Sequence, residues 1–381
     1  MAAADKRGGS GLTESERTWL AVRSYLTGHR YELGQQAAAE YPDLPKASSG
    51  PLLTRPEWVP AEPLALEALE IEFRPEASAG YRPDIADETV VPLRRDGSRY
   101  HSYSAAMREL AAPAVFENRA TYRLLDARLT ETRGRLVFGR GRYFDGIDTG
   151  EAAAHEYAGT RLGLTDARLR LAVPDPCDLA SRPANMAIST LTLCVAGPAE
   201  ASFLLHWRDP AKVGHAGGLY QVLPVGIFQP SDDSAASEVN DFSLWRCMLR
   251  EYAEELLGEP EHHAQRGSPI DYDAWPLANA MSAALHRGDA RAFVLGLGVD
   301  PLTFATDLLT VVALPQPLFL ELFGRLVIQN AEGRLVRHAG GIGIPFDAMS
   351  VRRFASTEPT QAAGAALLRL AWRHAAELLK L

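Results

Sequence analysis

Apolar residues recur at helical spacing in several segments of the N-terminal half of the chain. The pattern predicts helices at residues 13–39, with Thr13 or Ser15 as N-cap, at 103–112, and at 149–163, with Thr149 as N-cap. Two strand-like runs within residues 120–144 flank the polar letters TETRG and predict a β-hairpin. Residues 65–73 fit either a short helix or a strand. This half of the chain therefore reads as an α+β region.

Strand and helix patterns alternate after residue 185. The β-rich runs AISTLTLCVAG and ASFLLHWRD flank the turn letters GPAE and predict a second hairpin, and a third strand, GGLYQVLPVGIFQP, ends at Gly226. Helices are predicted at 242–257 with Asp241 as N-cap, at 276–287, within PLFLELFGRL, and in the amphipathic C-terminal segment. The strands RAFVLGLGVD and DLLTVVAL lie among these helices. Interleaved strands and helices predict an α/β or α+β fold.

Changes in composition divide the chain into four parts. Residues 1–12 predict a disordered tail, and residues 13–63 a helix followed by a connector with six prolines between residues 41 and 63. Residues 64–185 form the α+β N-terminal region, and residues 186–381 the C-terminal domain that ends in a helix.

Composition limits the classes of function. The formal net charge is −9, which argues against direct binding of nucleic acid or an anionic membrane. The chain has three widely spaced cysteines, no apolar signal segment, and no run of 18 apolar residues. We therefore expect a soluble, cytoplasmic protein.

Residues 245–257 carry an apolar stripe made of Trp245, Met248, Leu249, Tyr252, Ala253, Leu256 and Leu257. The opposite face carries Arg250, Glu251, Glu254 and Glu255, and carboxylates three and four positions apart on a helix can converge. Like charges at this spacing destabilise a helix by roughly 0.2–0.5 kcal/mol. A divalent cation would remove this repulsion, because Mg²⁺ prefers carboxylate oxygens and water. A solvated helix face is the plain alternative.

The same stretch resembles the box of the Nudix hydrolase family, G-x5-E-x7-R-E-U-x-E-E-x-G-U, where U is aliphatic. REYAEELLG (250–258) matches R-E-x-x-E-E in register, and LPVG (223–226) looks like the family's L-P-G-G. Upstream, FLLHWRDPAKVGHAGGLYQVLPVG is similar to the usual run of a strand, an arginine and G-x-W-x-L-P-G-G. The resemblance covers about residues 186–314, one third of the chain. It implies a Nudix-like α/β/α sandwich with a mixed sheet in the C-terminal half, plus an N-terminal α+β extension.

The resemblance also implies roles for single residues. Glu251, Glu254 and Glu255 would hold Mg²⁺ or Mn²⁺, Glu251 would also orient or deprotonate the attacking water, and Arg250 would position the glutamates through a salt bridge. Substrate contacts are expected from Gly226, Arg208 and Tyr220, and a further carboxylate from a later loop, Glu332 or Asp307.

Three departures from the family's pattern matter: the residue at the first glutamate, the spacing before the arginine, and the end of the box. Asp232 stands where the family has its first glutamate, and 17 residues separate Asp232 from Arg250 where the box has seven. Tyr252 replaces an aliphatic residue, and the box glycine is displaced by one position, to Gly258. These departures concern the loop before the helix and the contribution of the first glutamate.

Two functions fit these patterns. The first is a metal-dependent hydrolase of a nucleoside diphosphate linked to another moiety. The second is a non-catalytic protein that binds a nucleotide-like ligand and acts as a transcription-associated regulator. The mildly basic stripe of residues 13–39 consists of Arg17, Arg23, His29 and Arg30. It is predicted to be a dimerisation element, which would form a homodimer, a docking element, or the remnant of a linker from a DNA-binding module.

Overall fold

The computed structural model describes residues 11–76, 90–113, 115–130, 132–197, 200–208, 217–259, 268–327, 333–336 and 343–380. Residues 1–10 of the predicted tail, and Glu332, lie outside this part of the chain.

A mixed β-sheet forms the centre of the molecule. In the described residues its strands run in the order β1 (Leu64–Ala65), β10 (Arg291–Val299), β11 (Thr306–Pro315), β5 (Met186–Gly197), β6 (Glu200–Phe203) and β13 (Ile344–Pro345). Strand β9 (Val225–Ile227) pairs with the beginning of β5. Strands β11 and β5 are parallel, and the other neighbouring pairs are antiparallel. The short strand β1 comes from the N-terminal half, so this half contributes directly to the sheet.

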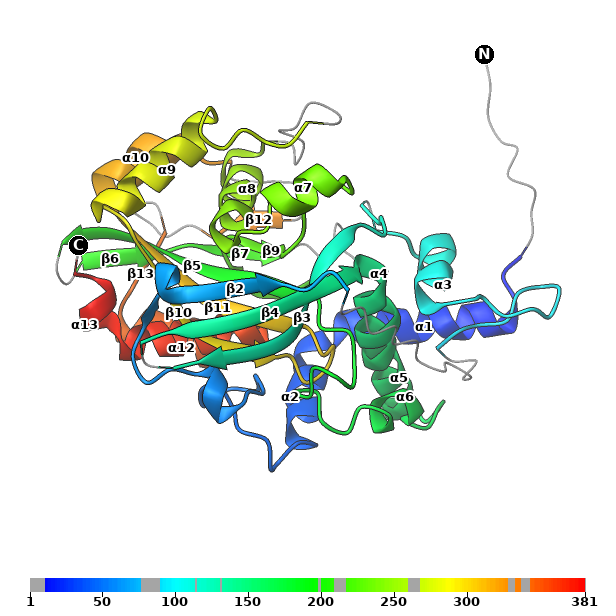
Figure 1. Ribbon diagram of the computed structural model, residues 1–381. Helices are drawn as coiled ribbons and strands as arrows, with labels where there is room; N and C mark the ends of the chain where they lie inside the picture. Colours follow the sequence, from blue (N-terminus) through cyan, green and yellow to red (C-terminus); the bar gives the residue numbers. More distant parts are fainter. Residues whose placement is uncertain are drawn as a thin grey trace, which may run out of the picture.

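Helices cover both faces of this sheet. On one face lie α8 (Leu244–Leu257), α9 (Pro276–Arg287) and α10 (Gln316–Phe323), and on the other lies α12 (Ala362–Arg373), as Figure 1 shows. Side chains alternate along β5, so that Leu191 and Leu193 face α12 while Ile188 and Cys194 join the core beneath α8. The predicted α/β/α sandwich with a mixed sheet is confirmed. The elements α11 (Ala348–Arg352), η4 (Arg353–Thr357) and α13 (Ala375–Leu378) flank α12.

Two smaller sheets complete the strand pairing. One has the order β2 (Leu69–Phe73), β4 (Gly134–Arg142), β3 (Ala120–Leu129), and the other β12 (Gly333–Leu335), β7 (Leu205–Arg208), β8 (Tyr220–Val222). Strands β3 and β4 confirm the first predicted hairpin. The predicted third strand is divided into β8 and β9 at Pro224, which has no N–H to donate to a ladder. Residues 204 and 223–224 thus separate segments that sequence patterns read as continuous strands.

The remaining helices belong mainly to the N-terminal half. They are α1 (Glu14–Gly28), α2 (Arg30–Ala39), α3 (Tyr103–Leu110), α4 (Tyr143–Gly146), the π-helical turn η3 (Ile147–Glu151), α5 (Ala152–Arg161), α6 (Arg168–Leu171) and α7 (Ala235–Asn240), with the 3-10 turns η1 (Pro56–Trp58) and η2 (Leu66–Ala68). None of the described helices is long and apolar enough to cross a membrane.

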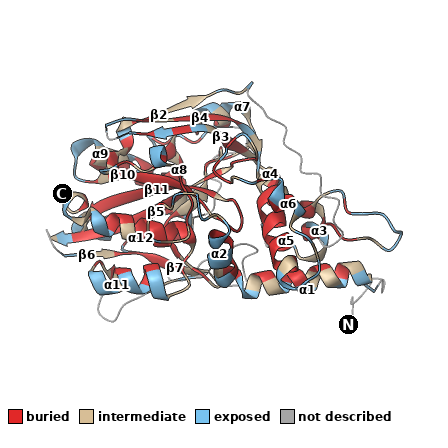
Figure 2. Ribbon diagram, turned by 90° about the horizontal axis from the view of Figure 1, so that it is seen from below, coloured by how far each residue is buried: buried red, intermediate tan, exposed pale blue. Residues whose placement is uncertain are grey.

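Two helix predictions in the N-terminal half need correction. The predicted helix 13–39 is interrupted at His29 and forms α1 and α2, although Thr13 does cap α1 by accepting a hydrogen bond from the backbone N–H of Glu16 at 3.0 Å. Thr149 is not an N-cap, because it lies inside a continuous helical rod of α4, η3 and α5. This rod stands beside the ends of the sheets, and its α5 portion is buried along most of its length (Figures 1 and 2).

A buried ion-pair network ties this rod to the first two helices. Glu151 is 2% exposed, and its carboxylate lies 2.6 Å from Arg23 Nη1 and 2.8 Å from Arg30 Nη1. Two of the four members of the predicted basic docking stripe are therefore buried inside the molecule. The predicted surface role is wrong for Arg23 and Arg30, because both guanidinium groups are buried and paired with Glu151.

We expect Glu151→Gln to lower the free energy of unfolding by about 3–5 kcal/mol, because it leaves two buried guanidinium groups without a compensating charge. Urea unfolding followed by circular dichroism measures this loss. The matched control is Glu40→Gln, which removes the partner of the exposed Arg161 and should cost less than about 1 kcal/mol. Equal losses in the two variants would show that the Glu151 network contributes little.

Candidate functional site

Helix α8 is held in one rotation about its axis. Ser243 caps its start and accepts a hydrogen bond from the backbone N–H of Arg246 at 3.3 Å, while Gly258 ends it in the left-handed region at φ 67°. On the face toward the sheet, the Tyr252 hydroxyl lies 2.8 Å from Thr192 Oγ1 of β5. With the tyrosine face fixed on the sheet, the positions of the polar residues of α8 follow.

Arg250 is buried against groups from three other segments. Its Nη1 donates to the Tyr272 hydroxyl at 2.6 Å, and its Nη2 donates to the carbonyl oxygen of Gln229 at 2.5 Å. Its Nη1 also lies 3.6 Å from Oδ1 of Asp241, a residue with no exposed surface that accepts a hydrogen bond from Tyr272 at 2.9 Å. Arg250 was predicted to position the glutamates through a salt bridge. In the structure it instead anchors α8 to these segments. Although burial acts to lower it, the pKa of Arg250 is raised by its neighbours Cys247, Tyr272 and Asp241.

Asp241 has a different position from the one predicted for it. The N-cap of α8 is Ser243, and Asp241 instead accepts hydrogen bonds from the backbone N–H and the hydroxyl of Ser231, at 2.8 and 2.6 Å. Asp232, which stands at the position of the family's first glutamate, accepts from the backbone in the turn before α7. Asp241 is also nearer than Asp232 to the spacing that the Nudix box has before its arginine.

The three glutamates of α8 have different surroundings. Glu255 is 8% exposed, and its Oε1 accepts a hydrogen bond from the backbone N–H of Val225 at 2.8 Å. The half-buried Glu251 packs on Gly226, where a Cβ atom would lie 2.0 Å from the Glu251 carboxyl carbon. Glu254 is exposed. Two of the carboxylates therefore lie along β9, and the third borders solvent beside them. We call these three glutamates with Val225 and Gly226 the α8–β9 carboxylate cluster.

This cluster does not form a closed metal cage. In the part of the chain that the structure describes, no three His, Cys, Asp or Glu side chains are placed so that they could hold a metal ion. Mg²⁺ is nevertheless commonly bound through one or two carboxylates, with water and substrate phosphates completing its shell. The more accessible Glu251 and Glu254 fit that shared type of site, whereas Glu255 is already engaged with Val225. A cation would thus bind here mainly together with an anionic substrate.

The other predicted substrate residues are not brought together. Arg208 Nη1 donates to Gln221 Oε1 at 3.1 Å across β7 and β8. The ring of Tyr220 packs edge-on against Phe354 at 5.2 Å, in the core beside α12. Because side chains alternate along a strand, Gln221 points to the face away from Tyr220. Tyr220 is therefore a packing residue on the face opposite α8, and its predicted role beside the carboxylates is wrong.

Asp307, the other predicted candidate for the later carboxylate, also lies on the α12 side of the sheet. It is 2% exposed and accepts a hydrogen bond from the Ser189 hydroxyl at 2.8 Å. Ser189 and Asp307 belong to the rows of β5 and β11 that face α12, so Asp307 cannot complete the cluster on α8. Burial raises the pKa of Asp307 to about 7, although the hydrogen bond from Ser189 opposes this shift.

The raised pKa of Asp307 predicts a pH-dependent stability. The unfolded chain releases this proton near about pH 4, whereas the folded protein holds it up to about pH 7. Between these values the folded state binds more protons, so the free energy of unfolding falls as pH rises, and the decrease is complete above the folded pKa.

We expect Asp307→Asn to lose this dependence and to be more stable than the wild type by a few kcal/mol at about pH 8.5, with little difference at about pH 4. The amide oxygen of asparagine can still accept the hydrogen bond from Ser189. Urea unfolding at both pH values checks this. Asp289→Asn, at an exposed ion pair with Arg287, serves as control. The assignment would be contradicted if the free energy of unfolding of Asp307→Asn changed with pH to the same extent as that of the wild type and of Asp289→Asn.

The structure shows two partners of Arg250 that sequence patterns missed, Tyr272 and Asp241. Tyr272 stands 22 positions from Arg250 in a segment without a motif, so its sequence carries no signal for this contact.

No protein-family model matches the chain, and a comparison with curated proteins found no significant match.

Proposed function

We propose that the protein is a divalent-metal-dependent hydrolase of a nucleoside diphosphate linked to another moiety, and that the α8–β9 carboxylate cluster is its active site. The observation that carries the proposal is the packing of Glu251 on Gly226, with Glu255 bonded to Val225 beside it. Glu251 and Glu255 thus project toward β9, which begins within the LPVG segment, as the resemblance to Nudix hydrolases requires, and Glu254 borders solvent beside them. The cysteines Cys177, Cys194 and Cys247 are all free and buried, in keeping with action in a reducing cytoplasm.

Each residue of the cluster has a distinct part in this proposal. A bound divalent cation supplies charge neutralisation and polarisation of a phosphoryl oxygen. The exposed Glu254 offers oxygen ligands at the surface, and Glu251 accepts the proton of the attacking water. The glycine at position 226 lets the Glu251 carboxyl group lie directly against the backbone of β9, where any larger residue would displace it. Glu255 holds α8 on β9, and Arg250 holds α8 on the segment that follows β9.

A second function is favoured by the surroundings of Glu255. Its carboxylate is buried and engaged with Val225, which leaves fewer oxygens for a cation. The burial of Glu255 fits a regulatory protein that binds a nucleotide-like ligand at this cluster without turnover. Such a protein would signal the presence of the ligand to a partner. The two functions make different predictions for turnover.

We expect Mg²⁺-dependent turnover of at least one compound in a panel of nucleotide sugars, dinucleotides and nucleoside diphosphates linked to other groups. Glu251→Gln should lower it by about 10²–10⁴-fold, because the variant cannot accept the proton of water. Glu254→Gln should raise the Mg²⁺ concentration needed for half-maximal turnover. Release of products, followed by chromatography, is the measurement, and Glu321→Gln on the exposed side of α10 is the control.

Saturable binding without turnover in this panel would favour the regulatory function instead. Turnover that Glu251→Gln and Glu254→Gln retain in full would contradict the assignment of the active site. Absence of both binding and turnover would contradict both functions.

We expect Gly226→Ala to act through Glu251. Its added Cβ would lie 2.0 Å from the Glu251 carboxyl carbon, so the carboxyl group must move away. Because this group is the end of a flexible side chain, the free energy of unfolding should change by less than about 1 kcal/mol, while turnover falls as in Glu251→Gln. Steady-state kinetics and urea unfolding measure the two effects. Gly28→Ala, whose Cβ meets no neighbour within 4 Å, is the matched control. Full activity of Gly226→Ala would show that the position of Glu251 does not matter.

A further inference from the structure

A second candidate site shares no lining residue with the α8–β9 cluster and lies in a cleft between the helical rod of residues 143–161 and the ends of the central strands. Its walls include Tyr143, Ile147 and Thr149 of the rod, Ile227 of β9, and Phe304 of the loop before β11. The empty space, counted out to the open mouth, is about 610 Å³. The lining is mainly apolar, and ligand sites often occur where two regions of a chain meet.

Thr149 is the polar group in this wall that has no partner. Its side chain is 1% exposed, and its Oγ1 forms no hydrogen bond with any residue that the structure describes. A buried donor left unsatisfied costs roughly 1–3 kcal/mol, so such a group calls for a partner that the chain does not supply. Thr149 also lies in the π-helical turn η3, and such turns are frequent at functional sites.

The other polar groups of the wall are already engaged. Asn185 Nδ2 donates to the carbonyl oxygen of Arg142 at 2.8 Å, and its Oδ1 accepts from the Thr121 hydroxyl at 3.1 Å. Thr303 Oγ1 donates to Asp300 Oδ1 at 3.0 Å. These groups shape the cleft, whereas Thr149 Oγ1 has no partner among the described residues.

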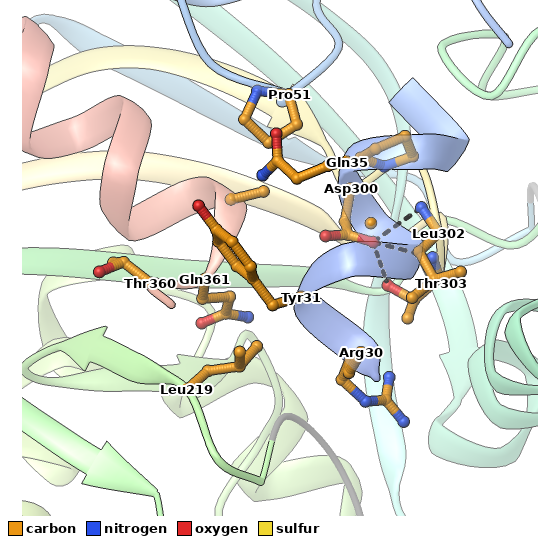
Figure 3. Close-up of a pocket in the computed structure, with 13 residues that line it drawn as sticks. Arg30, Tyr31, Gln35, Pro51, Leu219, Asp300, Leu302, Thr303, Thr360 and Gln361 are labelled. Atoms are coloured by element: carbon orange, nitrogen blue, oxygen red, sulfur yellow. Dashed lines mark hydrogen bonds between the residues drawn. The ribbon is translucent and has the colours of Figure 1, made fainter. Parts of the chain in front are cut away.

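The wall opposite the rod is in direct contact with it. A Cβ on Gly150 would lie 2.0 Å from the carbonyl oxygen of Thr303, so the rod and the loop before β11 are in direct backbone contact. Figure 3 shows a neighbouring hollow that shares Thr303 with the cleft, and in it Asp300 accepts hydrogen bonds from Leu302 and Thr303. Phe304 follows in this loop with a φ of 57°, a conformation that non-glycine residues rarely adopt and that clusters at ligand sites.

Charge in the cleft favours an uncharged ligand. Among the lining residues, the one charged side chain is Glu151, and its carboxylate is engaged by Arg23 and Arg30. A charged ligand would have to lose its water without meeting an available counter-charge.

We propose that this cleft binds a small, uncharged ligand with a flat apolar ring and one hydroxyl or carbonyl group that forms a hydrogen bond with Thr149 Oγ1. The site is independent of the proposed hydrolase activity, since none of its lining residues belongs to the α8–β9 cluster. The ring packs between the apolar walls, and the polar group satisfies the threonine.

Phenol and toluene are the probes, because they share a ring and differ in the hydroxyl. The chain has nine isoleucines, so isoleucine-methyl NMR gives a spectrum in which Ile147 and Ile227 report the cleft, and Ile71 and Ile270, which do not line it, report other parts of the molecule. We expect phenol to shift the Ile147 and Ile227 signals and to bind the wild type more tightly than toluene does.

Thr149→Val, which replaces the hydroxyl with a methyl group of the same shape, should weaken phenol binding by about two- to tenfold and leave toluene binding unchanged or tighter. Thr149→Ser keeps the hydroxyl and should retain the preference for phenol. Equal affinities of phenol and toluene for the wild type, an unchanged preference in Thr149→Val, or shifts confined to Ile71 and Ile270 would overturn the proposal. The comparison of the two probes on the wild type tests it even if the valine variant does not fold.

Discussion

The position of the candidate active site depends on one buried cation. Arg250 can remain inside the protein because Tyr272, the backbone of Gln229 and the carboxylate of Asp241 satisfy its guanidinium group. These partners come from segments before and after α8, so they fix the rotation and the height of the helix on the sheet. With α8 fixed in this way, Glu251 and Glu255 meet Val225 and Gly226 of β9, and Glu254 is left at the surface.

The N-terminal half is joined to the sandwich by the same kind of interaction. Glu151 neutralises Arg23 and Arg30, which brings α1 and α2 against the rod of residues 143–161. In addition, β1 pairs with β10, and the carbonyl oxygen of Thr303 packs on Gly150. The cleft lined by Thr149 exists because this rod is held rigidly beside the ends of β5 and β11. Two buried ion pairs thus define the two candidate sites.

Local patterns were sufficient for much of the fold. Alternating or continuous apolar runs predicted the hairpin β3–β4 and the strands β10 and β11, and helical periodicity predicted α8 and α9. It also predicted the C-terminal helix, which the structure divides at His374 into α12 and α13. In these elements the spacing of apolar residues along the chain shows whether one face or both faces are buried. Breaks within elements were not predicted: His29 interrupts a periodic stretch, and Pro224 divides a strand whose apolar run continues on both sides. The resemblance to Nudix hydrolases located the carboxylate helix and the LPVG segment, and it remains a prediction.

The sequence by itself determined that Glu251, Glu254 and Glu255 share one face of a helix, because the spacing of residues on a helix is set by its local geometry. It did not determine which of these carboxylates would face β9, or that Arg250 would turn toward Asp241 and Tyr272. The sequence also did not show that Tyr220 and Asp307 would lie on the α12 side of the sheet, opposite the glutamates of α8. The side of a sheet and the partner of a buried charge depend on contacts between residues far apart in the chain, and only the tertiary structure decides those contacts.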